Sequence, residues 1–505
     1  MSVAHRLVEE KTLAWVLANE TRSRLPDLPL TGLAINTRRI RPGWLFLACR
    51  GSREHGLHYL DEALARGAVA VAYEPVRNEP LPSTSRRVPM IPVPHLRRKA
   101  GSIAARFFDD PSAHLSVTGV TGTNGKGSVS MIIGQVLSDW GEPSGVIGSL
   151  GYGLYGMLDA ATETTPGPVR LQYYLARMRN HGAKHVAMEV SSHALDQNRV
   201  GGVHFENAVF TNLTRDHLDY HGTMESYMEA KARLFAWPGL RRAILNLDDP
   251  TSEYLCRHCD AGVECIGYGL HETPPAWFKG RHLYASTVRT GSAGLEAAVS
   301  GDFGTGRLRS RMIGRFNVSN LLAALTVLVV CGRAFEDALP RVAHARTVAG
   351  RMQRFGGGHL PLVIVDYAHT TDAMTQVLAA VREHARGRVI LVFGCGGGRR
   401  PEVRPELGRI AAQGADRIIL TDDNPRHEDP ERIFDEIRAG MAKKTPVAVE
   451  HDRAKAVEMA IGEARAGDVV LITGKGHETM QEVGNERHRY NDPDTVLRTL
   501  GHVAW

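Results

Sequence analysis

The residues Thr121-Gly122-Thr123-Asn124-Gly125-Lys126-Gly127-Ser128 have the composition of a phosphate-binding loop. Glycines in such a loop let backbone N–H groups approach phosphate oxygens, and the following helix N-terminus adds a favourable dipole. A lysine at the place of Lys126 neutralises the β- and γ-phosphates. We therefore expect nucleotide chemistry rather than an ordinary glycine-rich turn, with ATP contacts from Gly122, Thr123, Asn124, Gly125, Lys126, Gly127 and Ser128.

The residue after the lysine departs from the strict pattern of such loops. A serine or threonine normally follows the lysine directly and holds magnesium. Here Gly127 takes that place, and Ser128 comes one position later. The sequence leaves open whether Ser128 or another hydroxyl holds the metal.

The segments on either side of the loop have the patterns that such a loop requires. Leu115–Val120 suits a buried strand, and Val129–Leu137 carries apolar residues at helical spacing. The order is therefore strand, loop, helix.

Length and composition limit the class of protein. A chain of 505 residues is too long for one ordinary core, and about three domains are expected. The mean hydropathy of −0.21 and the 43% hydrophobic content are typical of a soluble globular protein. No apolar run reaches the length of a membrane span, so we expect a cytoplasmic protein with no membrane partner.

Cysteine usage and charge narrow the class further. Six cysteines without a regular framework fit a reducing compartment. The run Cys256-Arg257-His258-Cys259, with Cys265, superficially resembles zinc spacing, but no second pair follows and we favour buried or free thiols. The net charge of +6 comes without long basic blocks, which favours anionic small molecules over nucleic acid as partners.

Alternating strand-like and helix-like stretches predict an α/β fold of three domains. We place them at residues 1–112, 113–348 and 349–505. Short apolar runs in the second domain predict a mostly parallel, nucleotide-binding sheet flanked by helices. Similar runs in the third domain, at Leu362–Asp366, Val389–Phe393, Ile418–Leu420 and Val469–Ile472, predict a doubly wound, Rossmann-like unit.

Polar clusters directly follow several of these runs. In open α/β sheets, ligands bind beyond the carboxyl ends of the strands, so such clusters are candidate site residues. Five clusters in this position are unlikely to be only caps and solvated turns. They lie at Glu189–His193, Asn212–His221, Asp366–His369, Asp423–Arg426 and Gly474–Glu478.

One motif is misleading. Gly151-Tyr152-Gly153-Leu154-Tyr155-Gly156 matches a dinucleotide-binding pattern, but residues 157–168 after it contain no convincing helix. We do not expect a dinucleotide cofactor there.

Taken together, the motifs resemble those of the ATP-dependent Mur ligases of peptidoglycan synthesis, and the match runs nearly end to end. Beside the phosphate loop, it is carried by Arg38, Arg41–Phe46, Thr164–Pro166, Met188–His193, Gly314–Asn317, Gly350–Met352, Asp366–His369 and Asp423–Arg426.

The resemblance implies three domains that bind a UDP-sugar peptide, ATP and an incoming amino acid, with the reaction at their junction. In this family, ATP converts a carboxylate into an acyl phosphate, which an amine then attacks. Within the family, the motifs resemble the branch that adds meso-diaminopimelate to a UDP-N-acetylmuramoyl dipeptide. A monomer is expected.

The resemblance also implies which residues carry the chemistry. Lys126 and magnesium would screen the carboxylate from the triphosphate that it attacks. Glu189 and His217 are the expected magnesium ligands, with Ser128 as a candidate hydroxyl. Lys231 matches a lysine that the family carbamylates with CO2, giving an anion able to hold a second magnesium. From the pattern alone, Lys231 would be a lysine on the surface of a helix.

The remaining sites are assigned from the resemblance in the same way. Asn317, Arg351, Asp366 and His369 would complete the ATP site. The residues implied for the UDP-sugar peptide are Thr37, Thr164, Thr165, Ser191, Gln197 and Arg199. Those implied for diaminopimelate are Arg399, Asn424, Pro425, Arg426, Gly474 and Glu478.

Arg426 is the residue that favours diaminopimelate over lysine. Its paired N–H donors suit a distal carboxylate that lysine lacks, and Glu478 suits the distal ammonium. An unpaired buried arginine would reject lysine by several kcal/mol, as an order of magnitude.

Departures from the family pattern keep other interpretations open. Lys126-Gly127-Ser128 resembles the loop of folylpolyglutamate synthetases, and the loop Gly394–Pro405 lacks the acidic residues and the lysine usual around Arg399. A duplicated ligase that joins a different amine and carboxylate is one alternative. A nucleotide-binding switch protein without catalysis is another, but it would be expected to have lost Lys126, Glu189, His217 or Lys231.

Overall fold

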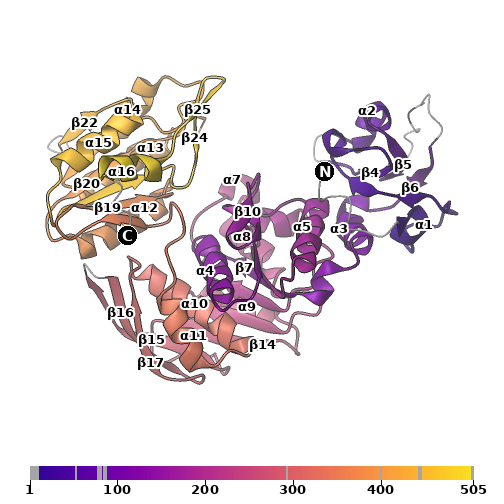
Figure 1. The fold of residues 1–505 in the computed structure, drawn as a ribbon, viewed down its shortest axis with the longest axis horizontal. Coiled ribbons are helices and arrows are strands. Elements are labelled where there is room, and N and C mark those ends of the chain that lie inside the picture. Colours follow the sequence, from indigo (N-terminus) through magenta and orange to yellow (C-terminus); the bar gives the residue numbers. More distant parts are fainter. Residues whose placement is uncertain are drawn as a thin grey trace.

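A computed structural model describes residues 11–51, 54–76, 82, 88–291, 294–398, 401–441 and 446–501. Three sheets, each with its own helices, follow one another along the chain. The unit around the central sheet lies between the N-terminal and C-terminal units (Figure 1). The fold is therefore the three-part α/β arrangement that the sequence predicts.

The N-terminal unit is a small parallel sheet with helices on both faces. Its strand order is β3 (Gly32–Ala34), β4 (Trp44–Ala48), β5 (Ala68–Tyr73) and β6 (Met90–Pro92). Side chains alternate between the two faces of a strand. Leu45 and Leu47 therefore pack toward α1 (Leu13–Val16) and α3 (Leu96–Phe107), while Phe46 packs toward α2 (Leu60–Ala65).

Two short strands and three 3-10 turns complete this end of the chain. The strands β1 (Lys11–Thr12) and β2 (Pro29–Leu30) pair antiparallel. The turns are η2 (Thr37–Arg39), η3 (Gly56–Tyr59) and η4 (Pro111–His114), and the last of these leads into the central sheet.

The central sheet has eleven strands over the described residues, in the order β10-β9-β8-β11-β7-β12-β13-β14-β15-β16-β17. Its middle, from β8 to β15, is parallel, and both edges are antiparallel. The strands are β7 (Ser116–Thr121), β8 (Ser144–Gly148), β9 (Gly151–Leu154), β10 (Met157–Asp159), β11 (His185–Glu189), β12 (Asn207–Phe210), β13 (Arg242–Asn246), β14 (Glu264–Gly269), β15 (His282–Gly291), β16 (Gly294–Gly301) and β17 (Gly306–Ser310).

Helices cover both faces of this sheet, so its middle strands β7, β11, β12 and β13 are almost entirely buried. On one face lie α4 (Lys126–Asp139), α10 (Phe316–Val330) and α11 (Phe335–Ala343). The other face packs against α5 (Pro168–Asn180), α6 (Ser192–Asp196) and α9 (Thr251–His258). The helices α7 (Leu218–His221) and α8 (Met224–Ala232) follow β12; His217 directly precedes α7, and α8 carries Lys231.

The C-terminal sheet has the order β18-β19-β23-β20-β21-β22. Only β18 is antiparallel among its described strands, which are β18 (Gln353–Gly356), β19 (Leu362–Asp366), β20 (Val389–Phe393), β21 (Arg417–Leu420), β22 (Val447–Val449) and β23 (Val469–Thr473). One face packs against α12 (Thr371–His384), α13 (Val403–Gly414) and α14 (Pro430–Arg438). The other packs against α15 (Arg453–Glu463) and α16 (Asp492–Thr499). A hairpin, β24 (Met480–Val483) and β25 (Glu486–Arg489), follows β23.

The apolar runs in the sequence coincide with strands. Leu362–Asp366 and Val389–Phe393 are β19 and β20 with the predicted bounds. The pattern Gly151–Gly156 forms β9 and a turn into β10, so strands and not a helix follow it. The antiparallel edges were not predicted, because half-exposed edge strands have no continuous apolar run.

The helix α12 joins the C-terminal unit to the central unit at both of its ends. At its start, Oδ2 of Asp372 accepts hydrogen bonds from Asn124 Nδ2 at 3.4 Å and Thr214 Oγ1 at 3.1 Å. At its end, His384 contacts the backbone of Gly291 at 2.7 Å and Gly314 at 3.3 Å. The phosphate loop is thereby tied directly to the C-terminal unit.

No helix in the described part of the chain is long and apolar enough to cross a membrane.

Candidate active site

The predicted phosphate loop connects the end of β7 to the start of α4. Gly122 has φ +145°, and a Cβ there would lie 1.9 Å from Thr211 Oγ1, so only glycine fits. The loop is braced by residues that follow β12. Asn124 N donates to Asn212 Oδ1 at 2.9 Å, and Thr211 Oγ1 donates to Asn124 O at 2.6 Å. These bonds therefore fix the shape of the loop.

Lys126 folds back over this loop. Its Nζ donates to the carbonyl oxygens of Gly122 and Thr123, both at 2.9 Å. Burial lowers the pKa of Lys126, and Glu189 and Asp216 nearby partly oppose that shift. The Lys126 ammonium group thus lies where a phosphate-binding loop would hold a triphosphate.

Lys231, on α8, is buried at the same loop. Its side chain is 2% exposed, and its Nζ donates to the Gly122 carbonyl oxygen at 2.8 Å, above the ring of Tyr227. The pattern-based expectation of a surface lysine is wrong, because Lys231 lies on the face of α8 that packs against the phosphate loop, while Glu225 and Glu229 on the same helix are exposed.

The environment of Lys231 favours its neutral form. Burial, and then the nearby Lys126 ammonium, hold the pKa of Lys231 well below its usual value. A neutral amine is a nucleophile, as reaction with CO2 requires. The surroundings of Lys231 are thus compatible with carbamylation.

Glu189 ends β11 and lies against the first turn of α4. Its Oε1 accepts hydrogen bonds from Ser149 N at 2.8 Å and Ser149 Oγ at 3.1 Å. A Cβ on Gly127 would lie 3.2 Å from the same oxygen, and one on Gly148 only 2.3 Å. The missing side chain of Gly127 therefore leaves room beside this carboxylate. Ser128 is half-buried on α4.

His217 lies in the loop before α7 with a left-handed backbone, at φ +52°. Its ring packs against those of His193 and Tyr227, with centroids 4.8 and 6.0 Å away, and its Nε2 lies 3.4 Å from Asp216 Oδ2. Burial is the main cause that lowers the pKa of His217. Burial and the two neighbouring histidines, His217 and His221, lower the pKa of His193 to about 4. Neutral imidazole is the form that can bind a metal.

The four expected catalytic residues thus surround one loop. Lys126 and Lys231 share the Gly122 carbonyl, Glu189 faces Gly127, and His217 contacts Tyr227 beneath Lys231. The described residues contain no ready-made cluster of three or more histidine, cysteine, aspartate or glutamate ligands. The Glu189 carboxylate and the open space at Gly127 nevertheless suit a cation such as Mg²⁺, which prefers oxygen ligands and retains water.

The residues expected to complete the ATP site form two groups. In the central unit, Asn317 Oδ1 accepts from Asn320 Nδ2 at 2.9 Å, and Asn320 packs against Gly125 of the loop. In the C-terminal unit, Asp366 ends β19 and accepts the backbone N–H groups of Met352 and Ala368, both at 2.7 Å.

Arg351 and His369 lie beside Asp366. The Arg351 guanidinium lies 4.6 Å from the ring centroid of Tyr367, and His369 Nδ1 contacts the Tyr367 carbonyl at 2.8 Å. Burial raises the pKa of Asp366, and Arg351 opposes this. His477 belongs to the predicted Gly474–Glu478 cluster but was given no role there. Its ring packs against Tyr367, and its buried Nδ1 has no hydrogen-bond partner among the described residues.

Four of the residues expected to contact the UDP-sugar peptide form one network. Thr165 Oγ1 donates to Glu189 O at 2.9 Å and accepts from Ser191 N at 3.1 Å. Arg199 donates to Thr165 O at 3.1 Å and, through Nε and Nη2, to Gln197 Oε1. Thr164 is half-buried beside them. Thr37 is separate, in the N-terminal unit, where it donates to Glu62 at 2.8 Å.

In the C-terminal unit, Asn424 and Glu478 are brought together by Lys475, a member of the predicted Gly474–Glu478 cluster that was not assigned to the diaminopimelate site. Lys475 is fully buried and donates to Asn424 Oδ1 at 2.9 Å and to Glu478 Oε2 at 3.0 Å. Asn424 Nδ2 also donates to Glu478 Oε2 at 3.0 Å. The position of Lys475 between Gly474 and Glu478 was the available signal.

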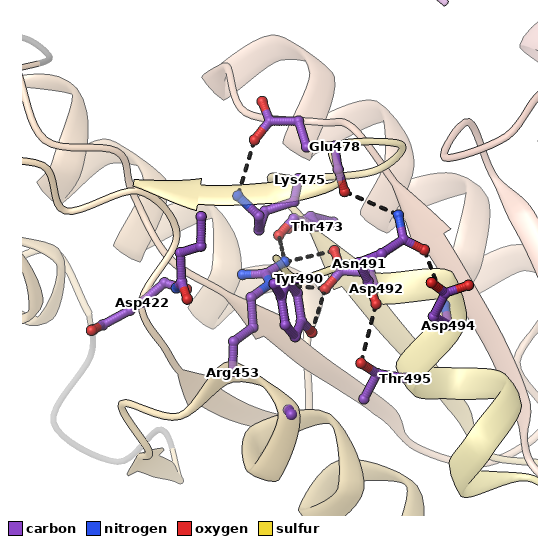
Figure 2. Close-up of polar contacts among 12 residues, drawn as sticks. Asp422, Arg453, Thr473, Lys475, Glu478, Tyr490, Asn491, Asp492, Asp494 and Thr495 are labelled. Atoms are coloured by element: carbon purple, nitrogen blue, oxygen red, sulfur yellow. Dashed lines mark hydrogen bonds and ion pairs between the residues drawn. The ribbon is translucent and has the colours of Figure 1, made fainter. Parts of the chain in front are cut away.

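A buried ion pair between Arg453 and Asp492 supports the Gly474–Glu478 turn. Arg453 donates to both carboxylate oxygens of Asp492, at 2.8 and 2.9 Å, and to the carbonyl of Thr473 at 2.8 Å (Figure 2). Gly474 follows with φ +112°, and a Cβ there would lie 2.3 Å from Asp423 Oδ2. Arg453 therefore fixes the end of β23 just before the Gly474–Glu478 turn.

Arg426 differs from the expectation of an unpaired buried arginine. Its side chain is 44% exposed, and its Nε donates to Glu482 Oε2 at 3.0 Å. It follows a buried Pro425 and forms an isolated parallel bridge with Val483 of the hairpin β24–β25. Arg399 lies outside the described residues.

The geometry defines a class of protein. The phosphate loop lies on a parallel sheet, beside buried lysines and a carboxylate. It also contacts a second doubly wound unit. This is the architecture of a three-domain nucleotide-dependent enzyme.

Comparisons with known proteins identify the family. Residues 29–108 match the Mur ligase family catalytic domain, 120–328 the Mur ligase middle domain, and 350–476 the Mur ligase glutamate ligase domain. The chain belongs to the Mur ligase family.

Relatives of similar length share one name. Two curated UDP-N-acetylmuramoyl-L-alanyl-D-glutamate–2,6-diaminopimelate ligases are 44% identical (Coxiella burnetii) and 46% identical (Pseudomonas aeruginosa). The alignments cover 97% and 95% of this chain and 99% and 96% of theirs. A solved structure with the same name is 32% identical with a TM-score of 0.72, covering 98% of this chain and 99% of that one.

Proposed function

We propose that this protein uses ATP to join meso-2,6-diaminopimelate to the γ-carboxylate of D-glutamate in UDP-N-acetylmuramoyl-L-alanyl-D-glutamate, a step of peptidoglycan precursor synthesis. The observation that carries the proposal is the convergence of Lys126, Lys231 and Glu189 on one phosphate loop. Relatives that match the chain along nearly its whole length carry the name of this reaction.

In the first step, a carboxylate oxygen of the substrate forms a bond to the γ-phosphorus of ATP while the bond from that phosphorus to the ADP oxygen breaks. Both reactants are anions, so the site must reduce their repulsion. Lys126 supplies positive charge at the loop, and the N-terminus of α4 adds its dipole.

In the second step, the amine nitrogen attacks the acyl carbon, inorganic phosphate leaves, and the amine proton is released. The amine is itself the nucleophile and the acyl phosphate is already activated, so the protein does not have to supply a nucleophile. Its residues position the two substrates and exclude water.

Magnesium would be held by Glu189 and His217, with Ser128 as a candidate hydroxyl and a carbamylated Lys231 for a second ion. Bound there, it would neutralise charge on the triphosphate and the acyl phosphate. The burial of Lys231 and its lowered pKa, which favours the neutral amine, support this assignment.

The remaining binding roles follow the three units, with boundaries proposed at residues 112 and 348. The N-terminal unit and the Thr165 network would hold the UDP-sugar peptide, through Thr37, Thr164, Thr165, Ser191, Gln197 and Arg199. The ATP site would be completed by Asn317, Arg351, Asp366 and His369. Diaminopimelate would contact Arg399, Asn424, Pro425, Arg426, Gly474 and Glu478. We propose a cytoplasmic monomer.

Phosphate release tests the function directly. Purified protein receives ATP, magnesium and the UDP-N-acetylmuramoyl dipeptide, together with meso-diaminopimelate, lysine or no amine. Release that depends on diaminopimelate, with a product of the tripeptide mass, supports the proposal. If the folded protein binds ATP but releases no phosphate with any of the wall precursors, the result would instead indicate a ligase for another amine and carboxylate.

A further inference from the structure

The hairpin β24–β25 is docked onto the loop that carries Asn424 and Arg426. Arg426 N donates to Glu482 O at 3.0 Å, and Gly484 N donates to Arg426 O at 2.6 Å. Glu482 N donates to Asn424 Oδ1 at 3.0 Å. Backbone and side-chain bonds thus hold the hairpin against the proposed diaminopimelate site.

The backbone of Arg426 needs this support. Its φ is +54°, in the left-handed region, which non-glycine residues rarely adopt because their Cβ crowds the following carbonyl oxygen. The two main-chain bonds to Glu482 and Gly484 fix that conformation. The direction in which the Arg426 side chain leaves the loop is therefore set by the hairpin.

The guanidinium of Arg426 is fixed as well. Its Nε donates to Glu482 Oε2 at 3.0 Å, and its Nη1 donates to Gly397 O at 2.6 Å. Nη2 has no hydrogen-bond partner among the residues that the structure describes. Two of the three nitrogens are thus held by the protein, and the third is left for a ligand.

We infer that Glu482 is a positioning residue that sets Arg426 to bind the second carboxylate of the amino-acid substrate. This inference rests on the proposed function, since it concerns the same acceptor site. A guanidinium held through Nε and one hydrogen of Nη1 still offers its Nη1/Nη2 edge, which matches a carboxylate with two parallel bonds.

The charge balance around Glu482 favours positioning over competition with the substrate. Glu482 Oε1 also accepts from Arg487 Nη2 at 2.9 Å, so one carboxylate is shared by two guanidinium groups. The group of Arg426, Glu482 and Arg487 keeps one net positive charge. An incoming carboxylate therefore still meets attraction.

The test compares three variants by phosphate release with varied diaminopimelate. Glu482→Ala removes the bond to Nε, and we expect the KM for diaminopimelate to rise about tenfold while kcat changes by less than about twofold. Glu482→Gln keeps an oxygen acceptor, and its KM should stay within about threefold of wild type. Glu486→Ala, on the same hairpin but exposed and without a contact to Arg426, is the matched control and should behave as wild type.

Each result has a distinct meaning. A lower KM for diaminopimelate in both Glu482 variants would overturn the inference, because it would show that the carboxylate competes with the substrate. An unchanged KM in Glu482→Ala would also overturn it. A wild-type protein that releases no phosphate with diaminopimelate would overturn the proposed function and this inference with it. Melting temperatures within a few degrees of wild type exclude misfolding as the cause of a raised KM.

Discussion

Asp372, at the start of a helix in the C-terminal unit, accepts a hydrogen bond from Asn124 of the phosphate loop, 248 residues earlier in the chain. The same oxygen accepts from Thr214 at 3.1 Å and from Gln376 at 3.2 Å. One carboxylate therefore connects the phosphate loop, the loop before His217 and the C-terminal unit. It also places a negative charge beside a site built for a triphosphate.

Replacing Asp372 by asparagine should tighten ATP binding. Asparagine keeps an oxygen acceptor but removes the charge, and a unit charge at short range in a hydrated site is worth about 1 kcal/mol, or about fivefold in Kd. Calorimetric titration with ATP measures this. Gln376→Ala, which removes a neutral donor to the same oxygen, serves as the control, and weaker binding by Asp372→Asn would contradict the expectation.

Lys126→Ala should reduce turnover by at least about 10²–10³-fold, because it removes the positive charge at the phosphate loop. Phosphate release under saturating substrates is the measurement. Circular dichroism and the melting temperature report whether the variant is folded. Turnover at the wild-type level would refute the assignment of the phosphate loop.

Gly148→Ala should impair the enzyme without altering any proposed ligand. The added Cβ would lie 2.3 Å from Glu189 Oε1 and so displace that carboxylate. A misplacement of about 1 Å at a reacting centre can cost about 10²-fold in kcat. Gly262→Ala, where a Cβ meets nothing within 4 Å, is a suitable comparison. Equal activity of the two variants would show that the position of Glu189 is unimportant.

Protonation of His384 should weaken its contacts with Gly291 and Gly314, which connect the C-terminal unit to the central unit. Burial lowers the pKa of His384 below 6.5, so between that lowered value and 6.5 the unfolded chain holds a proton that the folded protein lacks. Stability therefore rises with pH across this range and is lost as pH falls below about 6.5.

The variant His384→Asn tests this effect, because the asparagine amide nitrogen can take the place of Nδ1 toward the Gly291 carbonyl but does not titrate. Melting temperatures of both proteins are compared from pH 7.5 down to about pH 5. The wild type should lose more stability than the variant below pH 6.5. Parallel curves would show that His384 does not titrate in this range.

Arg426→Ala should raise the KM for diaminopimelate by about 10–100-fold, the usual cost of losing a charged hydrogen bond. Its kcat should change much less, because the distal carboxylate that Arg426 would bind is several bonds away from the reacting amine of diaminopimelate. Steady-state kinetics with ATP and dipeptide held saturating give both values. An unchanged KM would remove Arg426 from the acceptor site.

The sequence was sufficient for the family and for most of the fold. Buried parallel strands are apolar on both faces, so Leu362–Asp366 and Val389–Phe393 were predicted with the observed bounds. The antiparallel strands β15 to β17 alternate between buried and half-exposed positions and were not distinguished from loops.

Contacts between distant residues were the part of the site that local patterns could not predict. The burial of Lys231 depends on the packing of α8 against Gly122, more than a hundred residues away. The pairing of Arg426 with Glu482 depends on the docking of a hairpin after β23. Both are tertiary effects, and no helical or strand periodicity encodes them.

The bonds from Lys126 to its own loop carbonyls have a thermodynamic consequence. The lysine loses its water when the protein folds, so ATP exchanges carbonyl partners for phosphate oxygens and does not have to strip a hydrated ammonium. The arriving triphosphate must also raise the pKa of Lys126, which burial had lowered. At a pH between the pKa values of the free and the ATP-bound protein, ATP binding is coupled to proton uptake by Lys126, and in that range the heat of binding should depend on the ionisation enthalpy of the buffer.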